Sequence, residues 1–268
     1  MQPSVDLYNT SYANYALDVY QQVRIETYGQ DLGQTSWVNE EESRDIPRML
    51  HLEASSRVLE IGCGSGKYAL HLANSVPCTI LGLDINAPGV HNANQLASDA
   101  GLAERAEFKQ CDASKTLAFD DSSFDAVFSN DSLCHIPGRL ELLREMLRVL
   151  RPGGRMLFSD ALVVGGMISY EEITTRSSIG YYLYTPPGEN ERLIQQAHFQ
   201  NAQVSDTTQS ATTIAKRWYD AREKRKNQLL EFEGTKNFEG LQAFLSCVHR
   251  LTAERRLRRY LYLAEKPL

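Results

Sequence analysis

The segment "RVLEIGCGSGKYAL" (57–70) constrains the fold of this chain more than any other. An apolar run in it stops at three closely spaced glycines, and helix-forming residues follow at once. A strand, a glycine-rich turn and a helix in this order are typical of α/β folds that hold a nucleotide-like ligand at the turn, because glycine lets the backbone approach the ligand. The segment therefore predicts a parallel sheet with a ligand site at the carboxyl end of a strand.

Strand-like and helix-like segments alternate up to residue 160, which indicates a parallel sheet with helices on both faces. The expected strands are 57–61, 78–83, 105–110, 124–129 and 154–160, and the expected helices are 66–75, 88–100 and 138–150. The less regular remainder predicts a turn at 181–190, a strand near 201–209, helices at 214–232 and 238–256 and a last strand at 258–267.

The first 50 residues predict helix and loop. Tyr8, Tyr12, Tyr15 and Val19 follow helical spacing and are expected to share one face. The segment "YGQDLGQTSW" (28–37) predicts a loop, because glycines and polar residues break the pattern. No linker separates independent domains, so we expect one structural domain in three parts. These are an N-terminal helical lid (1–50), a ligand-binding core (51–165) and cap helices with the last sheet strands (166–268).

The composition limits the partners and the compartment. The net charge of −6 disfavours nucleic acid and anionic membranes as partners, and the basic segments "REKRK" and "RRLRR" are expected to be solvated helix faces. No run approaches the roughly 20 apolar residues that span a bilayer, and no secretory signal is visible at the N-terminus. The five cysteines form an odd set without a C-x-x-C pair, which predicts a reducing cytoplasm and no metal site.

Glu60 decides which kind of ligand the glycine turn suits. The glycine spacing is G-x-G-x-G, one residue shorter than the dinucleotide fingerprint G-x-G-x-x-G. A carboxylate two residues before the first glycine repels a diphosphate and attracts a cation. These two features disfavour an NAD-type dehydrogenase, which a test with NADH would exclude, and favour a ligand with positive charge.

Two further carboxylates follow later strands. Asp84 in "GLDI" comes about 20 residues after the turn, where an acidic residue can accept both ribose hydroxyls. Asp112 in "CDAS" is placed to meet an adenine amino group. An adenosine that also carries ammonium and sulfonium groups satisfies Glu60, Asp84 and Asp112 together, which predicts S-adenosylmethionine (SAM) as the cofactor.

Five motifs in order, "VLEIGCGSG", "GLDI", "CDAS", "FDAVFSNDSL" and "LRPGGRMLFSD", resemble the class I SAM-dependent methyltransferases. The resemblance covers roughly residues 57–160. It implies a doubly wound, seven-stranded, mostly parallel sheet of the Rossmann-like methyltransferase type, with a helical N-terminal lid, a helical cap insertion and an antiparallel last strand. It also implies a set of cofactor-binding residues in and after the first strands: Glu60, Gly62, Cys63, Gly64, Gly66, Asp84, Ile85, Asp112, Ala113 and Asn130.

His135 in "NDSLCHIPGR" is the candidate general base, because a histidine just past the fourth strand would face the transferred methyl group. The alternative is that it caps the helix that begins near Pro137. "DSLCH" resembles the D-x-x-x-H segment of phosphoethanolamine methyltransferases, which implies roles for Asp131 and His135. Together with Asp160 in "LFSD", the histidine is similar to that of glycoside O-methyltransferases, where an acid supports the base. The alternative for Asp160 is a simple strand-end acid.

The loop at 28–37 resembles the segment that closes over SAM in glycine/sarcosine-type methyltransferases. That resemblance implies that Gln34, Ser36 and Trp37 contact the methionine end of SAM and that Tyr28 approaches the methyl group. The alternative is a surface loop in which Trp37 anchors the core.

The tyrosines cluster in two regions, before residue 30 and near residue 182. Aromatic faces attract sulfonium and ammonium groups, so these clusters are candidates for the acceptor pocket, with plain helix packing as the alternative. The candidate acceptor residues are Tyr12, Tyr15, Tyr181 and Tyr184. For an acceptor with a carboxylate, Arg176 and Arg192 are candidate partners.

We therefore expect a SAM-dependent methyltransferase that acts on oxygen or nitrogen of a small polar metabolite, as a monomer or homodimer. The alternative is a non-catalytic SAM-binding regulatory or partner subunit. Arsenic methylation is disfavoured, because the spacing of the cysteines does not predict converging thiols.

Overall fold

A computed structural model describes residues 4–33 and 35–268 of the chain. Its core is a seven-stranded sheet in the order β3-β2-β1-β4-β5-β7-β6, in which β7 runs antiparallel to both of its neighbours. The strands are β1 Arg57–Ile61, β2 Thr79–Asp84, β3 Ala106–Gln110, β4 Phe124–Ser129, β5 Leu150–Val164, β6 Gln200–Asp206 and β7 Leu257–Glu265. The predicted doubly wound, mostly parallel sheet is confirmed.

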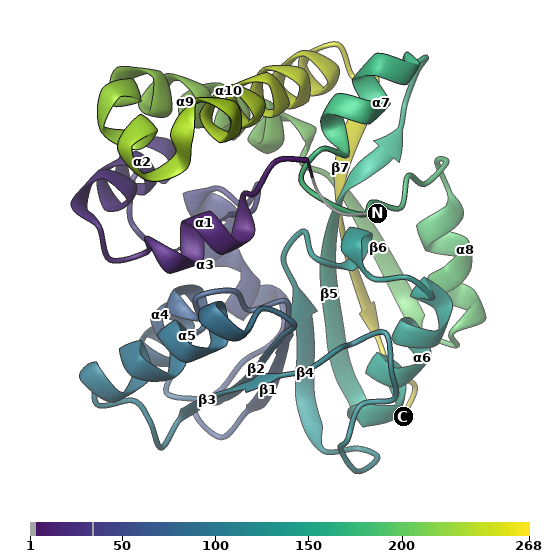
Figure 1. Cartoon of the computed structure of the whole chain (residues 1–268). Helices are drawn as coiled ribbons and strands as arrows, with labels where there is room; N and C mark the ends of the chain where they lie inside the picture. Colours follow the sequence, from purple (N-terminus) through teal and green to yellow (C-terminus); the bar gives the residue numbers. More distant parts are fainter. Residues whose placement is uncertain (1–3, 34) are drawn as a thin grey trace.

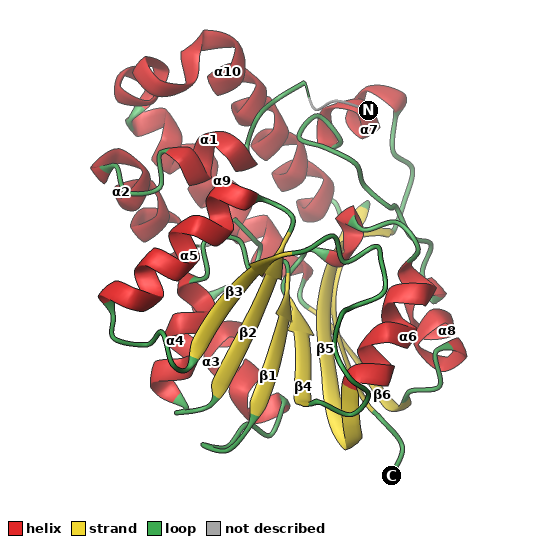
Figure 2. Ribbon diagram, turned by 60° about the horizontal axis from the view of Figure 1, so that its bottom comes forward, coloured by secondary structure: helices red, strands yellow, loops and turns green. Residues whose placement is uncertain are grey.

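Helices cover both faces of the sheet. Helices α3, α4 and α5 pack on one face, and α6 and α8 pack on the other (Figure 2). The helices are α1 Tyr8–Ala13, α2 Asp18–Tyr28, α3 Glu40–Met49, α4 Lys67–Ser75, α5 Ala87–Asp99, α6 Arg139–Val149, α7 Tyr170–Arg176, α8 Glu189–Gln196, α9 Thr208–Lys224, α10 Lys226–Ala253 and the short 3₁₀ helix η1 Leu133–His135.

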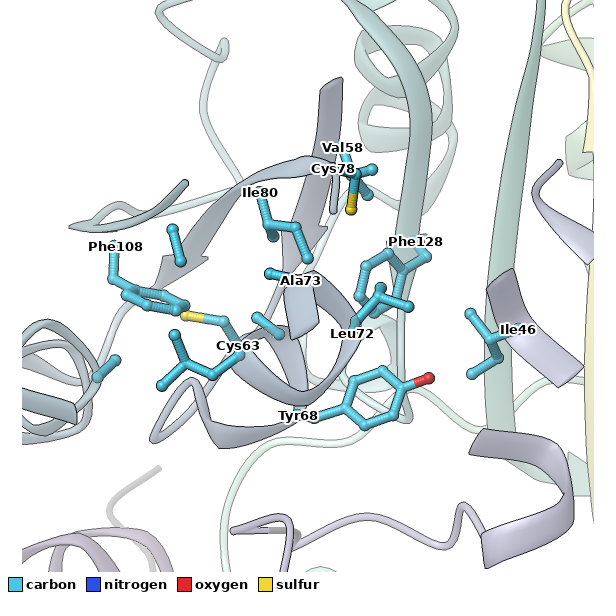
Figure 3. Packing of buried hydrophobic residues seen from close by; sticks show 14 of the residues in the cluster. Ile46, Val58, Cys63, Tyr68, Leu72, Ala73, Cys78, Ile80, Phe108 and Phe128 are labelled. Carbon is cyan, nitrogen blue, oxygen red and sulfur yellow. The ribbon is translucent and has the colours of Figure 1, made fainter. Parts of the chain in front are cut away.

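The side chains of each central strand alternate between these two layers, as the pleat of a strand requires. In β4, Phe128 packs toward α4 while Val127 faces the α6 side. Figure 3 shows Tyr68 and Leu72 of α4 against Phe128, with the Tyr68 hydroxyl directed toward Ile46 of α3. That hydroxyl donates to the carbonyl of Ser43 at 3.1 Å, so α3 is fixed to the sheet by both apolar and polar contacts.

The N-terminal segment differs from the prediction of one shared helical face. Helix α1 ends at Ala13 and α2 begins at Asp18. Between them Asn14 donates from its side chain to the carbonyl of Thr10, and Leu17 is extended, so the chain turns. The prediction was wrong here because local hydrogen bonding by an asparagine side chain competes with helix continuation.

The C-terminal helices also differ in extent. Helix α9 starts at Thr208, earlier than expected, and the break before α10 falls at Arg225. Gly234 has a φ of 69° inside α10 and kinks it. Strand β5 is longer than predicted at both ends, because Leu150 already pairs with Phe124 of β4 and the pairing with β7 continues to Val164 beyond an irregularity after Asp160.

Helices α1, α2, α9 and α10 gather beyond the carboxyl ends of the parallel strands (Figure 1). They share one apolar cluster, which includes Tyr20, Trp218 and Phe244. The first part of the chain is thereby fixed over the end of the sheet at which the glycine turn lies. In the described part of the chain, no helix is long and apolar enough to cross a membrane.

Candidate active site

A cavity of about 380 Å³ lies at the carboxyl ends of β1, β2 and β4. One side of it is closed by residues 29–33 and 35–38, which we call the covering loop. The residues of this loop that line the cavity are Leu32, Gly33, Thr35, Ser36 and Val38. Its walls include fourteen of the residues that the sequence singled out: Tyr12, Ser36, Glu60, Gly62, Cys63, Gly64, Asp84, Ile85, Asp112, Ala113, Asn130, Asp131, His135 and Tyr181.

The glycine turn is packed so closely that its glycines cannot be replaced without movement. Gly62 and Gly64 have φ of 79° and 54°. A Cβ at Gly62 would lie 2.2 Å from the Ser132 hydroxyl, and one at Gly64 would lie 2.4 Å from the Tyr12 hydroxyl. The Gly64 amide donates to an Asp84 carboxylate oxygen at 2.8 Å. The first two strand ends are therefore joined directly at the cavity.

Two acidic side chains, Glu60 and Asp84, lie at this end of the cavity. Glu60 is buried, and its Oε2 has no hydrogen-bond partner among the described residues. Burial and the neighbouring Asp84 raise the pKa of Glu60 to about 8. Burial also raises the pKa of Asp84, against the lowering effect of amide hydrogen bonds from Asn86 and Gly64. An unpartnered carboxyl group beside a second carboxylate fits a ligand that brings positive charge and donors.

His135 ends η1, directly after β4 and Asp131. Its Nδ1 lies 2.9 Å from the carbonyl of Tyr181, and its Nε2 lies 2.9 Å from the hydroxyl of Tyr8. A carbonyl can only accept, so Nδ1 carries the hydrogen and Nε2 accepts from Tyr8. Burial lowers the pKa of His135 to about 4, which leaves the imidazole neutral.

The alternative role of His135 as a helix cap is not supported. Helix α6 has Gly138 at its N-cap, in the left-handed conformation, and no side chain accepts from its first amides. Tyr8 is a site residue that the sequence reading did not assign to the cavity. Tyr8 belongs to the N-terminal tyrosine cluster noted in the sequence, but its contact with His135, 127 positions away, has no signal in the sequence.

Asp160 lies apart from the cavity lining. It is fully buried, and it forms an ion pair with Arg139 at 2.5 Å. It also accepts from the Asn190 side chain at 3.0 Å, and among the described residues no hydrogen bond connects it to His135. These contacts favour the alternative reading, in which Asp160 is a structural acid at the sheet.

Three aromatic candidates also lie behind the cavity wall. Trp37 and Tyr28 pack against Trp218, with ring centroids 6.0 and 6.2 Å apart. The Tyr15 ring stacks on the Arg24 guanidinium at 4.3 Å. Trp37 therefore anchors the core, as the alternative reading had it.

The remaining candidates fall into three cases. The Tyr184 hydroxyl lies 3.0 Å from that of Ser177, outside the cavity. Gly66 lies below the turn, where a Cβ would come 2.6 Å from Ala93. Gln34 lies outside the described residues.

Arg176 is buried close to His135. Its guanidinium carbon lies 4.3 Å from the ring centroid of Tyr182 and 5.0 Å from that of Phe244. Its Nε and Nη1 have no hydrogen-bond partner among the described residues. Together with Tyr8 and His135 it borders a second, very small void of about 10 Å³. Arg192, in contrast, is exposed and paired with Glu189 at 2.6 Å.

The described side chains include no group of three or more His, Cys, Asp or Glu residues arranged to hold a metal ion. The carboxyl groups of Glu60 and Asp84 lie at one end of the cavity and His135 and Tyr8 at the other, while Arg176 borders only the small second void.

Residues 59–158 match the family described as "Methyltransferase domain". The chain is 40% identical to 27-O-demethylrifamycin SV methyltransferase of Amycolatopsis mediterranei over 116 residues. This alignment covers 43% of this chain and 42% of that relative. It is 26% identical over 214 residues to phosphoethanolamine N-methyltransferase of Triticum aestivum, which covers 80% of this chain and 41% of the relative. The aligned part thus spans less than half the length of these curated relatives.

Solved structures share the fold. Haemonchus contortus phosphoethanolamine N-methyltransferase 2, in complex with phosphomonomethylethanolamine and S-adenosylhomocysteine, superposes with a TM-score of 0.81 at 22% identity, over 98% of this chain and 61% of that one. The [4+2]-cyclase SpnF superposes with a TM-score of 0.74 at 20% identity, over 98% and 99%. Residues 59–158 are thus similar in sequence to methyltransferase domains, and the chain shares the fold of these solved structures.

The raised pKa of Glu60 predicts a pH effect on stability. Between about pH 5 and 8 the folded protein holds a proton on Glu60 that the unfolded chain releases near its usual pKa of 4.5. The free energy of unfolding without ligand should therefore fall as pH rises, by at most about 1.4 kcal/mol per pH unit from this group. Glu60→Gln should remove that part of the slope in urea titrations. The control is Glu107→Gln, at an exposed carboxylate of β3, and an unchanged slope in Glu60→Gln would contradict the assignment.

Proposed function

We propose that the protein transfers a methyl group from SAM to an oxygen or nitrogen atom of a small polar metabolite, with His135 as general base. The observation that carries the proposal is the state of His135 at the cavity wall. Its Nδ1 hydrogen is directed to a carbonyl, so Nε2 is free of hydrogen and can accept a proton. The Tyr8 hydroxyl now donates a hydrogen bond to Nε2. We propose that the hydroxyl or amino group of the methyl acceptor takes this place when it binds.

The cofactor end of the cavity supports the same proposal. Asp84 would accept the ribose hydroxyls, the loop after β3 at Asp112 would border the adenine, and Glu60 with the glycine turn would hold the methionine part. SAM supplies an electrophilic methyl group on a sulfonium that is already a good leaving group. The work left to the chain is to align the acceptor and remove its proton.

The acceptor is proposed to carry an anionic group, a carboxylate or a phosphate. Arg176 supports this, because a buried guanidinium with two unpartnered nitrogen groups lies beside Tyr8 and His135. Desolvated charge of this kind is costly unless an anion pairs with it. The names of two matches, phosphoethanolamine N-methyltransferases, agree with such an acceptor.

The covering loop and helix α1 are proposed to act as the lid of this site, and the compartment is proposed to be the cytoplasm. The lid must open to exchange the cofactor, so its movement is proposed to contribute to the turnover rate.

A second candidate function is SAM binding without methyl transfer, as a regulatory or partner subunit. The fold does not decide between the two, since the solved structure of a [4+2]-cyclase shares it. The test is radiolabelled methyl transfer from SAM to amines, amino acids, phenols, glycosides and their phosphorylated forms. Transfer to one class supports the enzyme; SAM binding with no transfer to any class supports the second candidate.

His135→Ala should lower kcat by about 10² to 10⁴ while the affinity for SAM stays within a few-fold, because the general base is lost and the carboxylates remain. The measurement is steady-state methyl transfer together with calorimetric SAM titration. The control is His91→Ala, at an exposed histidine of α5 outside the cavity. A His135→Ala variant with wild-type kcat would remove the base from the proposal.

Arg176→Lys should raise KM for an anionic acceptor by about tenfold and change kcat less, because lysine cannot offer the paired donors of a guanidinium. Uncharged acceptors of the same class should show little change. Arg192→Lys is the matched control, since Arg192 is exposed and paired within α8. Equal effects of the two variants would show that no anionic group meets Arg176.

A further inference from the structure

Arg259 of β7 is completely buried and bonded to two carboxylates from distant parts of the chain. Its Nε donates to Asp131 Oδ1 at 2.9 Å, and its Nη1 donates to Glu42 Oε2 at 2.7 Å. The Thr207 hydroxyl accepts from the same Nη1 at 2.8 Å. The exposed fraction of Arg259 is 0%, and it does not line the cavity. Any effect of Arg259 on a bound ligand must therefore pass through another residue.

Asp131 is the residue through which Arg259 reaches the cavity. Asp131 lines the cavity wall between β4 and η1, with a φ of 55°. Its amide donates to the Ser159 hydroxyl at 2.9 Å, and its second carboxylate oxygen accepts from the Trp37 amide at 2.8 Å. With one oxygen bound to Arg259 and the other to Trp37, the carboxylate has a single orientation.

The Trp37 amide marks the end of the covering loop. Thr35, Ser36 and Val38 border the cavity on either side of it. The Tyr28 hydroxyl holds the carbonyl of Ser36 at 2.9 Å, but Tyr28 belongs to α2, which leads into the loop. Among the described residues, the hydrogen bond from the Trp37 amide to Asp131 links this part of the loop to the end of β4.

We propose that Arg259 is a positioning residue for cofactor retention: through Asp131 it holds residues 35–38 of the covering loop over the cavity. The functional part of this inference rests on the proposed role of the cavity as the SAM site. The structural part, closure of the loop, does not depend on it. Without the guanidinium, the Asp131 carboxylate loses its fixed orientation and the Trp37 amide loses a steady acceptor.

The two carboxylates explain why an arginine is used. Nε and Nη1 of one rigid guanidinium reach Asp131 and Glu42 at the same time, whereas a lysine ammonium is a compact charge on a flexible stem. Glu42 is held separately, since its Oε1 accepts from the Ser210 hydroxyl at 2.6 Å. Arg259→Lys keeps the charge and should lose the fixed geometry, which makes it the informative variant.

Amide hydrogen exchange of the protein without ligand tests the structural part. In Arg259→Lys, the protection of segment 35–38 should fall about tenfold, the size expected for loss of a charge-assisted hydrogen bond. Protection of β1, β2 and β4 should stay as in the wild type. The matched control is Arg155→Lys, the same substitution at the arginine that pairs with Glu265 at the other end of the β5–β7 pair. Unchanged protection in Arg259→Lys, or an equal fall in the control, would overturn the proposal.

The release rate of S-adenosylhomocysteine tests the functional part. It can be followed by intrinsic fluorescence, since Trp37 and Trp218 are the two tryptophans of the chain and their rings are 6.0 Å apart. Release should be about tenfold faster in Arg259→Lys and in Asp131→Asn, and the double variant should be no faster than the quicker single variant. If the fold increases in release rate of the two single variants multiply in the double variant, Arg259 does not act through Asp131 and the proposal fails.

If Arg259→Lys does not fold, Glu42→Gln and Asp131→Asn test the proposal in its place. It keeps the arginine on Asp131, so protection of segment 35–38 and the release rate should stay near wild type, while Asp131→Asn should lose both. Loss of protection in Glu42→Gln, or its retention in Asp131→Asn, would overturn the proposal. Neither readout uses methyl transfer, so failure of this inference and failure of the proposed activity are separate results.

Discussion

The arrangement of the site depends on the hydrogen bonds of one buried carboxylate, that of Asp131. It follows β4, binds Arg259 of β7 and accepts from the backbone of the covering loop at Trp37. The short helix η1, which carries His135, begins two residues later. One side chain thus contacts the end of the sheet and the segment that covers the cavity, close to the short helix that carries His135. A buried carboxylate without hydrogen-bond partners costs free energy, so conformations that break these hydrogen bonds are disfavoured.

Incompletely paired acidic and basic side chains lie at and behind the two ends of the cavity. Glu60 and Asp84 form a carboxylate pair at the glycine turn, and burial raises the pKa of both. Behind the other end, at the small second void beside Tyr8 and His135, the Arg176 guanidinium lies among aromatic rings, with two nitrogen groups unpartnered in the described structure. Each arrangement costs folding free energy, and each is relieved by a ligand of the opposite sign. A cationic methyl donor and an anionic acceptor would be separated and oriented by this field before any contact with His135.

The core of the fold could be predicted from the sequence because its signals are local. The alternation of strands and helices, the glycine turn and the acidic residue after β2 each depend on neighbours along the chain. The same is true of the lining residues near the turn, such as Gly62 and Gly64, and of Asp84. Asp84 is bonded to Gly64 across only 20 positions.

The parts that could not be predicted depend on contacts between distant segments. Tyr8 meets His135 across 127 positions, and Arg259 meets Glu42 across 217. No periodicity or spacing rule registers such pairs. Asp160 shows the converse case: its motif suggested chemistry, but it is buried in an ion pair with Arg139 at the start of α6, the helix that precedes β5. Trp37 has its ring in the core and only its backbone at the site, a division that a residue type alone does not indicate.

The most direct test of the account is a crystal structure of the protein with S-adenosylhomocysteine. The account predicts one molecule in the cavity, with its ribose hydroxyls on Asp84, its amino group near Glu60, its adenine beside Ile85 and Asp112, and its sulfur directed toward the His135 side. A ligand bound elsewhere, or in the cavity with its sulfur turned away from His135, would contradict it.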